Sequence, residues 1–191
     1  MNKTDALPLP MNRKLYFSEQ VDQKSIHEIT KQILEINDDD AFLNDLYNVY
    51  GIGKYEAPPI ELYIDSYGGQ VYQCLGLIGV METSKTPIHT YVTGCAMSCG
   101  FIILISGHRR FAYKHATPLY HQVSKGMWAP MKTIEEEVKE GKRLQKKLEK
   151  LTLSKTKITN KKLKSIYTRK IDWFMTPKEA LKLGVIDEII K

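Results

Sequence analysis

Gly94-Cys95-Ala96-Met97-Ser98-Cys99-Gly100 is the stretch of sequence that decides the fold. Apolar residues 88–92 precede it and a second apolar run, 101–105, follows it, which predicts a strand, a sharp turn and a helix. The backbone passes close to itself in such a turn, so the residues around the serine must be small. The stretch therefore predicts a nucleophilic serine whose neighbouring amide faces the same space, or, alternatively, a small polar residue that caps a buried helix.

The composition of the chain predicts one globular domain. Its 191 residues are 42% hydrophobic and 26% charged, which is enough to build a sizeable core. No apolar run is long enough to cross a bilayer and the first residues contain no apolar signal core, so we expect a cytoplasmic protein without a membrane partner.

The three cysteines, Cys74, Cys95 and Cys99, form no disulfide framework. Cys95 and Cys99 have the spacing of metal ligands, but no second pair of Cys or His residues accompanies them. We therefore interpret them as small residues that fill a turn and a helix, and predict no metal site.

The net charge of +6 raises the question of nucleic-acid binding. Most of the excess lysine lies between residues 142 and 164, where it alternates with leucines and shares the segment with glutamates. This pattern is typical of the solvated face of a long amphipathic helix, so no nucleic-acid partner is expected.

Hydrophobic periodicity along the rest of the chain alternates between strands and helices and predicts an α/β fold. The expected strands are 15–17, 60–64, 88–92, 109–113, 118–121 and 185–186. The expected helices are 22–36, 71–81, 101–105, 133–153, 160–168 and one that starts at Thr176-Pro177 and ends before Gly184. The first ten residues are expected to be extended or disordered, and residues 41–59 to form an irregular insertion. Just before that insertion, Asp38-Asp39-Asp40 is interpreted as a solvated helix end rather than a cation site.

A serine nucleophile requires a base, a group that orients the base, and amide donors for an oxyanion. Among the five histidines, His121 is slightly favoured because it ends a predicted strand, where α/β sheets place functional residues. Any single histidine can equally be structural. Gly68-Gly69 opens a helix after a strand and predicts either an anion-binding pair of amides or a tight turn. Asp172, considered alone, is weak evidence for the group that orients the base.

Five motifs taken in order resemble the proteolytic subunit of the Clp protease (ClpP). They are Ile64-Asp65-Ser66-Tyr67-Gly68-Gly69, the Gly94–Gly100 stretch, Tyr120-His121-Gln122, Asp172-Trp173-Phe174-Met175-Thr176, and Glu179-Ala180 with Leu183-Gly184-Val185-Ile186-Asp187. The resemblance runs from about residue 15 to the C-terminus. It implies an α/β fold of the crotonase/ClpP type: a short flexible segment, 1–14, then a single peptidase domain, 15–191. A handle helix protrudes from that domain within about 123–155, and its leucine stripe is expected to be an interface.

The resemblance also implies a serine endopeptidase with a Ser-His-Asp triad and no cofactor. Ser98 matches the nucleophile, His121 the general base and Asp172 the acid that orients the imidazole. The expected oxyanion donors are backbone amides of Gly68, Gly69 and Cys99, and Gly126 lies in the segment that binds substrate backbone. The expected partners are unfolded polypeptides, further copies of the chain in a ring, and an AAA+ unfoldase that makes the proteolysis ATP-dependent.

The sequence departs from the pattern of this family at several positions. Only about fourteen residues precede Leu15, fewer than the family usually has in the part that docks an unfoldase. Ile171 replaces an arginine that helps to register stacked rings. Tyr67 replaces the usual proline, and residues 37–59 are longer than the family norm. Three alternatives therefore stay open: a narrow-task peptidase of the phage-maturation type without an unfoldase, a catalytically silent ring subunit, and an acyl-CoA enzyme of the crotonase fold. The complete set of Ser98, His121 and Asp172 weighs against the last two.

Overall fold

The computed structural model describes residues 12–191, and the segment predicted to be extended or disordered falls almost entirely outside them. The described residues form a seven-stranded sheet whose main path runs β1-β2-β3-β4-β7. The strands are β1 (Lys14–Phe17), β2 (Ile60–Ser66), β3 (Ile88–Met97), β4 (Arg109–Tyr113), β5 (Thr117–Tyr120), β6 (Trp173–Phe174) and β7 (Glu188–Ile190). Pairs along this path are parallel, β5 joins β3 in parallel, and β6 joins β5 antiparallel. The predicted α/β class is confirmed.

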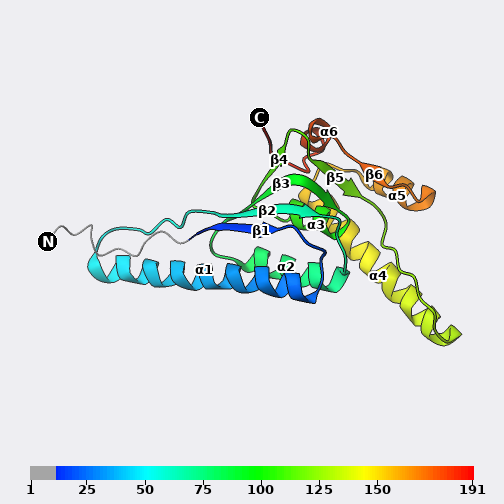
Figure 1. Cartoon of the computed structure of the whole chain (residues 1–191), viewed down its shortest axis with the longest axis horizontal. Helices are drawn as coiled ribbons and strands as arrows, with labels where there is room; N and C mark the ends of the chain where they lie inside the picture. Colours follow the sequence, from blue (N-terminus) through cyan, green and yellow to red (C-terminus); the bar gives the residue numbers. More distant parts are fainter. Residues whose placement is uncertain (1–11) are drawn as a thin grey trace.

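Helices lie against this sheet and extend beyond it (Figure 1). They are α1 (Gln23–Tyr50), α2 (Val71–Thr83), α3 (Cys99–Ile105), α4 (Met131–Lys155), α5 (Asn160–Arg169) and α6 (Pro177–Lys182). Helices α1 and α2 run beneath the strands, whereas α4 projects away from the body of the molecule as the predicted handle (Figure 1). No helix among residues 12–191 has the length and apolar character needed to cross a membrane.

Alternation along the central strands places apolar side chains against the helices. In β2, Ile60, Leu62 and Ile64 are fully buried in the core, while Tyr63 faces the other side of the sheet. On that other side, Tyr63 stacks on Tyr16 at 5.2 Å and on Tyr91 at 4.9 Å between ring centroids. Cross-strand aromatic pairs of this kind help to fix strand register.

Helix α1 is longer than predicted, because the region expected to become irregular at residue 41 stays helical to Tyr50. Gly51 then ends the helix in the left-handed conformation, with a φ of 61°. The interpretation of residues 38–40 as a solvated helix end was wrong for Asp40, which is buried and forms an ion pair with Arg13. Tyr55 also donates a hydrogen bond to Asp40, at 2.7 Å. These partners are distant in sequence, so local pattern did not reveal them.

The C-terminal part confirms one local prediction and corrects two. Thr176 caps α6 in a capping box with Glu179: each accepts the other's backbone N–H, at 3.3 and 2.8 Å. The last strand was predicted at 185–186 but begins at Glu188, because its pairing with β4 starts there. Strand β6 was not predicted, and its two residues are too few to show a period.

The leucine stripe of α4, predicted to be an interface, packs largely against the core of its own chain. Leu144 and Leu148 are buried within this chain, and Leu148 belongs to its main hydrophobic core. The exposed large apolar side chains of α4 are instead Met131 and Val138, nearer its N-terminal end.

Candidate active site

Ser98 lies at the junction of β3 and α3 in a conformation that few residues other than glycine adopt. Its φ is 53° and its ψ is −118°. Its N–H donates to the carbonyl oxygen of Leu119 at 3.1 Å, which ties the turn to β5. Ser98 occupies the N-cap position of α3, but its side chain makes no capping hydrogen bond. The geometry is therefore that of a strained, projecting hydroxyl rather than of a helix cap.

The small residues around Ser98 have a direct steric cause. A Cβ atom on Gly68 would lie 2.6 Å from the carbonyl oxygen of Met97 and 2.7 Å from Cβ of Ser98. A Cβ on Gly100 would lie 3.0 Å from the carbonyl oxygen of Ser66. The predicted close crossing of the backbone is thus present, and Gly68 packs directly against the serine.

The Gly68-Gly69 turn is held by the segment before α1. Val21 donates its N–H to the Gly68 oxygen at 2.8 Å and accepts the Gln70 N–H at 2.7 Å. The Gly68 N–H donates to Ser66 Oγ at 3.1 Å. Within residues 12–191, the Gly69 N–H has no hydrogen-bond acceptor, so it is the amide of this turn that remains available for an anion.

Cys99 supplies the second available amide, since the first N–H groups of a helix have no intrahelical acceptor. Its thiol donates to the Gly69 oxygen at 3.2 Å and so links the two donor segments. A hydrogen bond with the Cys74 thiol lowers the pKa of Cys99 and raises that of Cys74. Both cysteines are buried and free, and so is Cys95, whose burial raises its pKa to about 11. The interpretation as small filler residues is confirmed.

Ser98, His121 and Gly69 line one cleft of about 220 Å³. Most of its remaining wall is apolar and comes from Val71, Ile102, Tyr120, Val123 and Leu148. The structure therefore brings the predicted nucleophile, base and one oxyanion donor to the same cleft. No group of three His, Cys, Asp or Glu side chains within residues 12–191 is arranged to hold a metal ion.

His121 and Asp172 approach each other because β5 and β6 pair. Tyr120 lies opposite Trp173 in this antiparallel pair, so the residues just beyond them become neighbours. The His121 Nδ1 and Asp172 Oδ1 atoms are 3.5 Å apart. The Asp172 side chain is 64% exposed, against 26% for His121. The acid thus sits at the rim of the cleft in solvent.

The structure does not bring Gly126 to this cleft. Residues 121–130 form neither helix nor strand, and Gly126 is exposed with open space around it. One residue that sequence reasoning missed lies nearby: buried Gln145 of α4 accepts the Val123 N–H at 2.7 Å. Its only sequence signal was a polar residue within the leucine stripe.

Comparison with known proteins agrees with this geometry. The Clp protease family model matches residues 53–191. The chain belongs to the Clp protease family. Its crotonase/ClpP-like fold therefore follows from membership as well as from the parallel sheet and its helices.

Three relatives of the Clp family are named ATP-dependent Clp protease proteolytic subunits. That of Deinococcus radiodurans is 35% identical over 69% of this chain, and the match spans only 64% of that relative's own length. That of Porphyromonas gingivalis is 28% identical over 96% of this chain and 76% of its own. Subunit 2 of a Synechococcus strain is 29% identical over 93% of this chain and 83% of its own.

Proposed function

We propose that this chain is a serine endopeptidase that hydrolyses peptide bonds of unfolded polypeptides inside a ring of identical subunits, fed by an AAA+ unfoldase. The observation that carries the proposal is Ser98, held at a φ of 53° in a cleft that His121 also lines. Residues 15–191 would act as one peptidase domain, in keeping with the Clp relatives.

In this proposal Ser98 Oγ attacks the carbonyl carbon of the substrate while His121 takes the hydroxyl proton. The Gly69 and Cys99 amides stabilise the resulting oxyanion, because neither amide donates to a protein acceptor in the turn. His121 then returns the proton to the leaving amine, and water releases the acyl group by the same steps.

Asp172 is proposed to orient His121 once subunits assemble. Its distance of 3.5 Å from His121 is longer than a good hydrogen bond, and its carboxylate faces solvent. A neighbouring subunit that covers this rim would lower the local dielectric and favour the shorter contact. Exposed Trp128, Met131 and Val138 on the projecting part of the chain supply apolar surface for such contacts.

The test is labelling of the protein with a fluorophosphonate probe, together with its mass in solution. We expect Ser98 to be labelled in an oligomer of several subunits and Ser98→Ala to abolish labelling. Cleavage of unfolded peptides should fall on the order of thousands-fold or more in the same variant. Ser106→Ala is the matched control and should be labelled normally. It removes the hydroxyl of a buried serine at the C-terminal end of α3.

Three outcomes would count against the proposal. An assembled oligomer that is not labelled would favour the catalytically silent ring subunit. Labelling and peptide cleavage that persist in Ser98→Ala would exclude Ser98 as the nucleophile. Cleavage that never responds to any added unfoldase and ATP would favour the narrow-task peptidase.

A further inference from the structure

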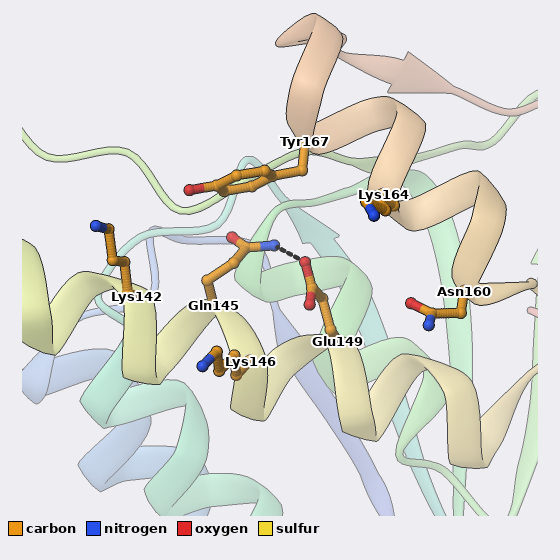
Figure 2. Close-up of a pocket in the computed structure, with 7 residues that line it drawn as sticks. All are labelled: Lys142, Gln145, Lys146, Glu149, Asn160, Lys164 and Tyr167. Carbon is orange, nitrogen blue, oxygen red and sulfur yellow. Dashed lines mark hydrogen bonds between the residues drawn. The ribbon is translucent and has the colours of Figure 1, made fainter.

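A second cavity of about 310 Å³ lies between α4 and α5, on the opposite side of Gln145 from the catalytic cleft. Figure 2 shows Tyr167 and Lys164 of α5 facing Gln145 and Glu149 of α4. Nothing in the proposed peptidase chemistry uses this cavity.

The cavity is strongly basic. Lys142, Lys146 and Lys164 line it, against a single carboxylate from Glu149. In the part of the chain that the structure describes, no carboxylate lies within ion-pair distance of any of the three ammonium groups. Elsewhere on α4, Arg143 pairs with Glu140 and Lys155 pairs with Glu82. Three ammonium groups without an ion-pair partner therefore share this one cavity with a single carboxylate.

The lysines come from two helices, which separates this site from an ordinary solvated helix face. Lys142 and Lys146 lie one turn apart on α4, and Lys164 reaches the same space from α5. The Tyr167 hydroxyl and the Asn160 amide add neutral donors along the wall (Figure 2). Such a set suits a compact anion with two or more negative charges, because ammonium groups bind phosphate oxygens as point charges.

Gln145 connects this cavity to the catalytic cleft. Its Nε2 donates to Glu149 Oε1 at 2.8 Å, and its Oε1 accepts the Val123 N–H at 2.7 Å. Val123 lines the catalytic cleft two residues after His121. An anion that repels the Glu149 carboxylate would remove one partner of Gln145 and loosen its hold on Val123.

We propose that the α4–α5 cavity binds an anion of the diphosphate class and that its occupancy weakens the Gln145–Val123 hydrogen bond. Free pyrophosphate and the diphosphate of a nucleotide share this chemistry. Both halves of the proposal, anion binding and the weaker Gln145–Val123 hydrogen bond, are independent of the peptidase proposal.

The first test is equilibrium binding of pyrophosphate and, in a separate arm, of ADP to the full-length protein. We expect saturable binding that Lys146→Gln/Lys164→Gln weakens about tenfold or more. Lys147→Gln/Lys150→Gln makes the same charge change on exposed lysines of α4 outside the cavity, and should change affinity less than about threefold. Binding of pyrophosphate without ADP would assign the site to the free ion; tighter ADP binding would assign it to a nucleotide.

The second test measures exchange of the Val123 amide hydrogen with and without pyrophosphate. We expect the ligand to speed exchange about threefold or more, and Gln145→Leu to lose this response while still binding pyrophosphate. Neither measurement needs peptidase activity, so an inactive but ligand-responsive protein would contradict the proposed function alone.

The proposal fails if neither ligand binds saturably at millimolar concentration, or if the two double variants lose affinity equally. It also fails if bound ligand does not change the exchange rate of the Val123 amide hydrogen. A change of mass in solution for Lys146→Gln/Lys164→Gln alone would assign these lysines to a subunit contact instead.

Discussion

The two sides of the catalytic cleft differ in how firmly a single chain holds them. On the nucleophile side, Ser98 is fixed by β3, α3 and a glycine turn with no room for a Cβ atom. On the acid side, Asp172 is 64% exposed and 3.5 Å from His121, and the segment after His121 has no regular structure. The fold of one chain thus fixes the proposed nucleophile firmly, while the acid proposed to orient the base stays open to solvent.

The largest change in the free energy of unfolding is expected from Gly68→Ala. A methyl group there meets backbone and Ser98 Cβ below 3.0 Å, at a φ of +95°. We expect a loss of about 3 kcal/mol or more and a fall in fluorophosphonate labelling of about a hundredfold or more. Chemical denaturation and labelling rates measure the two effects.

Gly79→Ala is the matched control, because a Cβ at Gly79 of α2 meets open space. It should stabilise the protein by about 0.5–1 kcal/mol and leave labelling intact. Equal behaviour of the two variants would show that the serine turn is not tightly packed.

A smaller loss, about 2 kcal/mol, is expected from Asp40→Asn, which leaves Arg13 without its buried carboxylate. Burial alone would raise the Asp40 pKa, but hydrogen bonds from Arg13, Thr86 and Tyr55 outweigh it and lower the pKa below 3.8. A carboxyl with a depressed folded pKa stabilises the fold above its unfolded pKa. The contribution of Asp40 should therefore be present at neutral pH and disappear as the pH falls below about 4.

Urea unfolding of the wild type and Asp40→Asn across pH 2–7 checks this; the difference between them should shrink on acidification. Exposed Asp38→Asn on the same helix should cost under about 0.5 kcal/mol. A constant difference across that pH range would contradict the ion-pair explanation.

Asp172→Asn, unlike Asp40→Asn, should lower peptide cleavage and leave the free energy of unfolding almost unchanged. Because this carboxylate is exposed, unfolding of the single chain should change by less than about 0.5 kcal/mol. Peptide cleavage by the assembled protein should nevertheless fall about a thousandfold or more, since His121 loses the group that selects its tautomer. An Asn variant as unstable as Asp40→Asn would mean that the acid side is held as firmly as the serine side.

The smallest change in unfolding is expected from Trp128→Ala, because this side chain is 102% exposed and contacts little of its own subunit. Analytical ultracentrifugation should instead show weaker self-association, as expected when a large apolar anchor is removed from an interface. Unchanged mass at every concentration would show that Trp128 lies outside the subunit contacts.

Sequence reasoning succeeded where the determinants are local. Neighbouring residues determine the serine turn, the Thr176–Glu179 capping box and most strands, so these could be predicted from the sequence. It failed at α1, whose second half is stabilised by Arg13 and Thr86, far from Asp40 in sequence. Its position at a strand end favoured His121 only slightly, and the family resemblance was needed to join it to Asp172, because the pairing of β5 with β6 that unites them leaves almost no trace in two residues.

The bridge between Val21 and Gly69 makes the position of the Gly69 amide depend on the segment that follows β1. Two backbone hydrogen bonds connect Val21 to the residues on either side of Gly69, and a Cβ atom on Gly69 would lie 2.3 Å from the Val21 carbonyl oxygen. A substitution that displaces the Val21 backbone is therefore expected to move the proposed oxyanion amide, although Val21 itself does not line the cleft.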